Sequence, residues 1–174
     1  MKYIELRRHS KRNKSSPHLS QEGVRLAREI GDRLGPYYKV YSSYAPRAIQ
    51  TAVAMGFAVN EISDEISMTP AGIEKEIKWG MNFDEYANVI EKGYKTAKYS
   101  NELVSYLLKL SNPMPESSTL LLISHGGLIE IATIGCVPEL DYTLWGEALD
   151  ECEGVKLTIE NKKFTEARLL RIKK

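Results

Sequence analysis

The chain has 174 residues, of which 43% are apolar and 27% are charged, a composition typical of one soluble domain with an ordinary hydrophobic core. The 24 Lys and Arg residues nearly balance the 23 Asp and Glu residues, and the net charge of +1 argues against a nucleic-acid partner bound through gross charge. Cys136 and Cys152 lie far apart, which disfavours a disulfide framework or a cysteine-based zinc site and favours a reducing, cytoplasmic compartment.

The first half of the chain reads as alternating strands and helices. Ser20 has the side chain of an N-cap, and apolar residues at helical spacing follow it until Gly35-Pro36, a pair that ends helices. Pro46 opens a second helix. The predicted elements are a strand at 3–6, a helix from 20 to 34, a strand at 39–43, a helix from 46 to 55 and a strand at 57–66.

The second half contains the clearest strand of the chain. Residues 119–124 form an apolar run of the kind that is buried on both faces of a parallel sheet, and this run is far too short to cross a bilayer. Residues 67–100 carry no readable motif beyond a short helix at 83–92, and we expect them to form a lid or insertion over a site. The other predicted elements are helices at 101–110 and 128–134 and strands at 154–160 and 164–172.

Strands that alternate with helices predict a mostly parallel sheet covered by helices on both faces, which is a three-layer α/β/α sandwich. The final pair of strands is expected to form a hairpin at one edge of this sheet. In such folds, ligands lie beyond the carboxyl ends of the strands. His9 follows the first strand and His125 follows the clearest one, so the topology predicts that both imidazoles lie in one site.

The residues near these histidines favour a negatively charged ligand. Arg8 and Arg12 flank His9, and guanidinium groups match phosphate oxygens in their geometry. Arg47 lies in the first turn of the helix after the second strand, and His125 precedes a glycine pair and another helix. Helix N-termini offer free N–H groups and a positive dipole. Three strand ends therefore converge on one anion, most simply phosphate.

A neutral histidine beside a phosphoryl group can act as a nucleophile, and the phosphoenzyme that forms splits one difficult displacement into two easier steps. Arginines would neutralise the charge that grows on the phosphoryl oxygens. Neither a metal nor a cofactor is indicated, because the sequence contains no His-Glu-x-x-His pattern and no paired Asp cluster.

Four segments resemble signatures of the histidine phosphatase superfamily, whose fold is phosphoglycerate mutase-like. In chain order they are Arg8-His9-Ser10-Lys11-Arg12, Leu19–Gly23, Ser42–Ala52 and Ser124–Gly127. The similarity implies a single domain of this kind over residues 1–174, in which residues 67–100 are an insertion over the cleft. The segment at 64–72 looks more like the small phosphohistidine phosphatases.

The resemblance also implies a role for each motif residue. His9 would be the phosphorylated nucleophile, and Arg12 stands where one branch of the superfamily has a further phosphate-binding arginine. The implied catalytic residues are His9, His125, Arg8 and Arg47. The implied phosphate-binding residues are Arg8, Arg12, Arg47, His125 and Gly126.

The sequence departs from the superfamily pattern at two places. Ser10 stands where the first signature has glycine, which matters if the backbone there needs a positive φ or a close approach to phosphate. Many members also place a proton-donating glutamate shortly after the third strand, and that position here falls on Met68. The nearby carboxylates lie outside this register and are Asp64, Glu65, Glu74 and Glu76.

Together these features predict a metal-independent phosphatase that hydrolyses a phosphomonoester or a phosphoramidate through a phosphohistidine at His9. The expected partners are a phosphorylated small molecule or phosphoprotein, with inorganic phosphate as product, and neither nucleic acid nor membrane. Two alternatives stay open. One is phosphoryl transfer of the phosphoglycerate mutase type, and the other is a weakly active phosphate-binding or phosphoprotein-binding module.

Overall fold

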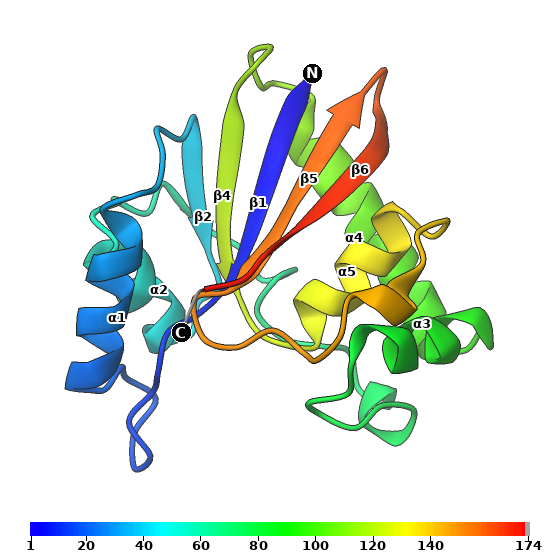
Figure 1. The fold of residues 1–174 in the computed structure, drawn as a ribbon, viewed down its shortest axis with the longest axis horizontal. Helices are drawn as coiled ribbons and strands as arrows, with labels where there is room; N and C mark the ends of the chain where they lie inside the picture. Colours follow the sequence, from blue (N-terminus) through cyan, green and yellow to red (C-terminus); the bar gives the residue numbers. More distant parts are fainter. Residues whose placement is uncertain (173–174) are drawn as a thin grey trace.

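A six-stranded sheet lies between two groups of helices in the computed structural model, which describes residues 1–172 (Figure 1). The strands are β1 (Lys2–Arg8), β2 (Lys39–Ser42), β3 (Glu61–Ile62), β4 (Thr119–Ser124), β5 (Gly154–Glu160) and β6 (Lys163–Leu170). The helices are α1 (Gln21–Gly31), α2 (Pro46–Ala54), α3 (Phe83–Glu91), α4 (Lys95–Ser111) and α5 (Leu128–Cys136), with short 3₁₀ turns η1 (Ile73–Lys75) and η2 (Tyr142–Leu144).

The order of the strands across the sheet is β3-β2-β4-β1-β5-β6. The first four strands in this order are parallel, whereas β5 pairs antiparallel with β1 and β6 pairs antiparallel with β5. Helices α1 and α2 lie on one side of the sheet and α3, α4 and α5 on the other (Figure 1). The predicted three-layer sandwich with a mostly parallel sheet and a terminal hairpin at its edge is therefore confirmed.

Strand β4 links the two halves of the core because its side chains alternate between the two faces of the sheet. Leu120 and Leu122 belong to the cluster formed with α4 and α5, while Leu121 and Ile123 belong to the cluster formed with α1 and α2. All four side chains are at most 1% exposed. This two-sided burial fixes the register of β4 and with it the position of the residues that follow Ser124.

The first helix begins where predicted and ends early. The Ser20 hydroxyl caps α1 by accepting a hydrogen bond from the Gly23 N–H at 3.0 Å. Helix α1 ends at Gly31, because the next residues form short-range bonds such as Leu34 N–H to the Gly31 carbonyl at 3.0 Å. Apolar spacing continues through this turn, and for that reason the predicted helix was too long.

The predicted strand at 57–66 is mostly wrong, since only Glu61–Ile62 pairs in the sheet. The Phe57 N–H donates to the Ala52 carbonyl at 3.0 Å and stays with the end of α2. Phe57 and Val59 pack against the α1 and α2 side of the core instead of entering a ladder. Apolar spacing alone does not distinguish these two kinds of burial.

Helix α4 begins at Lys95, six residues before its predicted start at 101. The Glu76 carboxylate accepts hydrogen bonds from the N–H groups of Lys95 and Thr96 at 3.1 and 2.9 Å. A cap supplied from a distant part of the chain satisfies the free donors of the first turn but leaves no local signal. Within residues 1–172, no helix combines the length and the apolarity that crossing a bilayer requires.

Candidate active site

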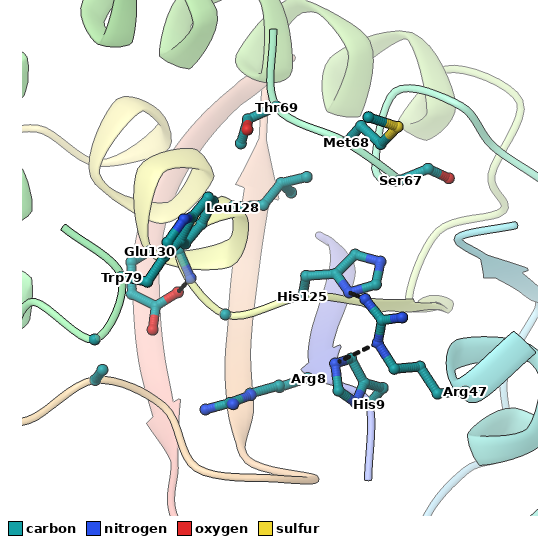
Figure 2. Close-up of a pocket in the computed structure, with 14 residues that line it drawn as sticks. Arg8, His9, Arg47, Ser67, Met68, Thr69, Trp79, His125, Leu128 and Glu130 are labelled. Carbon is teal, nitrogen blue, oxygen red and sulfur yellow. Dashed lines mark hydrogen bonds between the residues drawn. The ribbon is translucent and has the colours of Figure 1, made fainter. Parts of the chain in front are cut away.

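Three neighbouring strands end at the same edge of the sheet and carry the predicted site residues. Arg8 of β1 is paired with Ser124 of β4, and the His9 N–H donates to the Ser124 carbonyl at 2.9 Å. His9 and His125 therefore leave the sheet side by side. Arg47 enters from the first turn of α2, just after β2 (Figure 2).

One guanidinium group joins the two imidazoles. The Arg47 Nε donates to His9 Nε2 at 3.0 Å, and its Nη2 donates to His125 Nδ1 at 3.2 Å (Figure 2). The centroids of the two rings are 5.2 Å apart and the ring planes are inclined by 65°. Three side chains that are widely separated in the sequence thus meet in one cluster, as the positions of the strand ends predict.

Hydrogen bonds define the tautomer of each histidine. His9 Nδ1 donates to the Ser10 carbonyl at 2.8 Å, which leaves the lone pair of His9 on Nε2. His125 accepts from Arg47 at Nδ1, so its Nε2 carries the proton and donates to the Ser43 hydroxyl at 2.8 Å. Ser43 is not among the site residues predicted from the sequence, although its place directly after β2 puts it at the same edge of the sheet.

Both imidazoles are neutral near pH 7. Burial lowers the pKa of His9 to about 4, and the charges of Arg47, Arg8 and Arg12 act in the same direction, while the hydrogen bond to the Ser10 carbonyl opposes them. Burial also lowers the pKa of His125 to about 3, aided by His9, Arg47 and Arg8. A neutral His9 retains the lone pair that a nucleophile needs.

These lowered pKa values predict a pH-dependent stability. An unfolded histidine titrates near 6.5, so between about pH 6.5 and pH 4 the unfolded chain binds protons that the folded chain excludes. The free energy of unfolding therefore falls as the pH drops through this window, and the two histidines contribute no such loss above it. Urea unfolding of the wild type and of His125→Asn at pH 7 and pH 5 checks this prediction. The variant is expected to lose less stability than the wild type, and equal losses would contradict the assignment.

The structure brings Arg8 and Gly126 to the same place but leaves Arg12 at the rim. Arg8 is half-buried and its Nη1 donates to the Leu149 carbonyl, whereas its buried Nε has no hydrogen-bond partner within residues 1–172. A side chain on Gly126 would lie 3.3 Å from this Nε. Arg12 is exposed and is absent from the described lining of the pocket, and it acts on His9 through its charge.

A pocket of about 410 Å³ opens in front of the two histidines. Figure 2 shows the Arg47, His9 and His125 side chains gathered on one side of it and Trp79 on the other. Its lining comes from six parts of the chain and consists of Arg8, His9, Arg47, Ser67, Met68, Thr69, Trp79, Gly80, His125, Gly126, Gly127, Leu128, Glu130 and Ala148.

Comparison with known proteins identifies the fold. No protein-family model matches the chain, and no curated protein sequence does either. Phosphoserine phosphatase from Entamoeba histolytica, solved with 3-phosphoglyceric acid, covers 99% of this chain and 98% of its own at 18% identity, with a TM-score of 0.72. Mycobacterial glucosyl-3-phosphoglycerate phosphatase covers 96% of each chain at 18% identity (TM-score 0.59), and YhfR from Bacillus stearothermophilus covers 95% of each at 16% (TM-score 0.65).

The chain has the phosphoglycerate mutase-like fold. The motif residues Arg8, Ser42 and Ser124 end three neighbouring strands at one edge of the sheet. The motif at the start of α1 is tied to this edge by the hydrogen bond from the Ser10 hydroxyl to the Gly23 carbonyl. Within residues 1–172, no group of three or more His, Cys, Asp or Glu side chains is arranged to hold a metal ion.

Ser10 is accommodated in the phosphoglycerate mutase-like fold without backbone strain. Within residues 1–172, the non-glycine residues with positive φ do not include Ser10. Its buried hydroxyl donates to the Gly23 carbonyl at 2.7 Å, and its N–H donates to the Thr51 hydroxyl at 2.9 Å. Serine therefore connects the loop after β1 to the start of α1.

The Ser10 hydroxyl is expected to contribute to stability. Ser10→Ala should lower the free energy of unfolding by about 1 to 2 kcal/mol, because a buried hydrogen bond to the Gly23 carbonyl is lost. Ser105→Ala is the matched control, since the exposed Ser105 hydroxyl also donates to a backbone carbonyl, that of Asn101, at 3.0 Å. Urea unfolding of both variants checks the prediction. Equal free energies of unfolding for Ser10→Ala and Ser105→Ala would contradict it.

The position expected for a proton-donating glutamate is occupied by an apolar side chain. Met68 lines the pocket and is 66% exposed. The described lining does not include any of the nearby carboxylates, Asp64, Glu65, Glu74 and Glu76. Glu76 instead caps α4.

Glu130 is the carboxyl group that the described lining does contain. It is fully buried, and its oxygens accept from the Gly127 N–H at 2.6 Å and the Leu149 N–H at 3.0 Å. Burial raises its pKa, against the effect of these hydrogen bonds and of the Arg8 charge. Glu130 and Arg8 thus hold the Leu149 backbone from both sides. Sequence reasoning missed Glu130, although a glutamate in the first turn of a helix is a recognised capping signal.

Proposed function

We propose that the protein is a phosphatase that works through a phosphohistidine at His9. The observation that carries this proposal is the orientation of the His9 ring. Its Nδ1 donates to the Ser10 carbonyl, so the lone pair is on Nε2. This lone pair points at the Arg47 guanidinium, which also contacts His125. A neutral nucleophile surrounded by fixed donors suits a dianionic phosphoryl group.

In the structure the Arg47 guanidinium donates hydrogen bonds to both imidazoles. In the first step these N–H groups donate to the phosphoryl oxygens instead. His9 Nε2 attacks phosphorus, so a P–N bond forms while the bond to the leaving group breaks and its electron pair departs with that group. Arg47 and Arg8 neutralise charge on the phosphoryl oxygens. The proton stays on His9 Nδ1, which still donates to the Ser10 carbonyl. The phosphorylated ring is therefore cationic and a good leaving group.

In the second step water attacks phosphorus and the P–N bond breaks. The electron pair returns to His9 Nε2, the water loses a proton to solvent, and inorganic phosphate leaves. His125 helps to hold the phosphoryl oxygens in both steps, and Ser43 keeps its ring in place. Gly126 lets the chain approach the phosphoryl group closely.

The leaving group receives little help from an acid in this site. Met68 stands where a glutamate is expected, and both oxygens of the Glu130 carboxyl group in the lining accept hydrogen bonds from backbone N–H groups. A leaving group that needs no strong acid is therefore favoured over an alkoxide. The nitrogen of a phosphoramidate is such a group, because it is basic enough to take its proton from water and then departs as a neutral amine or imidazole. The substrate is thus a phosphorylated small molecule or a phosphoprotein, and neither nucleic acid nor membrane is a proposed partner.

We also propose that residues 1–174 act as one catalytic unit in which residues 67–100 cover the cleft. Support comes from the pocket lining, to which this segment contributes Met68, Thr69, Trp79 and Gly80. A cytoplasmic location is supported by Cys136 and Cys152, which are both free and buried.

Release of inorganic phosphate tests the proposal. Protein treated with EDTA should release phosphate from phenyl phosphate and from a phosphohistidine peptide. Interconversion of 2- and 3-phosphoglycerate without phosphate release would instead assign a mutase. Phosphate binding with no turnover of any of these compounds would assign a binding module, and either result would overturn the phosphatase proposal.

A further inference from the structure

The pocket continues beyond the histidines along an apolar wall. Trp79 and Met68 both line it, and they are 60% and 66% exposed. In Figure 2 Trp79 lies on one side of the pocket, beside Leu128, and Met68 lies on the other side, beside Ser67. Large apolar side chains that stay exposed beside a reactive centre are candidates for contact with a substrate.

Trp79 is held in place against the backbone. A side chain on Gly127, which has φ +84°, would come within 2.4 Å of the Trp79 ring, so only glycine lets the indole lie there. Within residues 1–172, Trp79 makes no ring contact of the kind that fixes Trp145, whose centroid is 5.0 Å from that of Phe83 and 5.1 Å from that of Tyr142. Ring packing thus explains the position of Trp145, whereas the Trp79 ring lies against Gly127 and remains 60% exposed.

The charges in the pocket disfavour a leaving group that carries a carboxylate. Its described cations are Arg8 and Arg47, together with two histidines that are neutral near pH 7. Arg47 already serves the reacting end, and Arg8 Nη1 donates to the Leu149 carbonyl. The remaining ionisable group is Glu130, which offers no positive charge.

The chemistry of the leaving group agrees with this apolar wall. A phenol has a pKa of about 10, whereas water and simple alcohols are far weaker acids. A phenolate can therefore depart with the electron pair of the broken P–O bond and take its proton from water afterwards. Cleavage of an aryl phosphate therefore does not require an acidic residue at the position of Met68.

We propose that the natural substrate is an aryl phosphate whose ring binds against Trp79 and Met68 while its phosphoryl group lies among His9, Arg47 and His125. This inference rests on the proposed phosphatase function and names the substrate class of the same site. The ring stacks on the indole, and the Met68 thioether lines the pocket on the opposite side.

Kinetics of Trp79 variants test the inference. Trp79→Ala should raise KM about tenfold for phenyl phosphate and less than about twofold for methyl phosphate, whereas Trp79→Phe should keep most of the preference for the ring. Comparing each variant with the wild type on the same substrate removes the difference in intrinsic reactivity. Tyr94→Ala is the matched control, because Tyr94 is 66% exposed and lies outside the described lining. Equal changes for both substrates would overturn the inference.

Binding of phosphonates separates this inference from the proposed chemistry. Phenylphosphonate and methylphosphonate cannot be hydrolysed, and calorimetry measures their affinities directly. The wild type should bind phenylphosphonate about tenfold more tightly, and Trp79→Ala should lose that difference. This pattern without turnover of any substrate would refute the phosphatase and still support the ligand class. Equal affinities in the wild type would overturn the ligand class even if phosphate release is observed.

Discussion

Replacing His9 by alanine is expected to lower kcat for phenyl phosphate by about 10⁴-fold or more, because the side chain that forms the covalent bond is gone. The remaining guanidinium groups and His125 still bind phosphate, so KM should change much less than kcat. Steady-state phosphate release, with circular dichroism to verify folding, measures both quantities.

His18→Ala is the control for this variant. His18 is exposed, lies outside the described pocket lining and contacts Gln50 through Nδ1 at 2.9 Å. Its turnover should equal that of the wild type. If His9→Ala retained activity within tenfold of the wild type while His18→Ala was unaffected, the nucleophile would have to be another residue.

Replacing Arg47 by alanine is expected to have the second largest effect, a loss of about 10³-fold in kcat/KM. This guanidinium contacts both imidazoles and offers the donors that a phosphoryl group would use. Arg47→Lys should recover little activity, because one ammonium group cannot reproduce a planar fork that points in two directions. Recovery to within tenfold would contradict the bridging role.

The same variant has a signature that does not depend on activity. The charge of Arg47 lowers the pKa of His9 and of His125, so Arg47→Ala should raise both values. Titration of the imidazole resonances by NMR measures this shift. Arg12→Ala serves as the comparison, since the Arg12 charge acts on His9 but not on His125, so this variant should leave the pKa of His125 unchanged. Because Arg12 is exposed and outside the described pocket lining, its loss should lower kcat/KM by less than about tenfold. If the pKa values of His9 and His125 were unchanged in Arg47→Ala, the contact of Arg47 with the two imidazoles would not exist in solution.

The sequence was sufficient to predict the meeting of His9, Arg47 and His125. Each residue follows a strand whose type was readable, and parallel strands deliver their carboxyl ends to one edge of the sheet. The pairing of β1 with β4 and of β4 with β2 then puts the three strand ends next to one another. Arg8 and Gly126 follow from the same register.

Features that depend on contacts between distant segments were not predictable. The Glu76 cap that starts α4 comes from 19 residues away, and the burial of Glu130 requires the loop at Leu149. The Trp79 ring lies where a side chain on Gly127 would clash with it, and Gly127 is far along the chain. The start of β3 was predicted too early because Phe57 and Val59 pack against the α1 and α2 side of the core and have no strand partners.

The most direct test of the central claim is to trap the phosphoenzyme. Protein mixed with excess phenyl phosphate and quenched in alkali, where phosphohistidine survives, is digested and its peptides are sequenced by mass spectrometry. The account predicts a phosphoryl group on His9 in the wild type and in His18→Ala, and none at this position in His9→Ala. A phosphoryl group on a residue other than His9 would contradict the account.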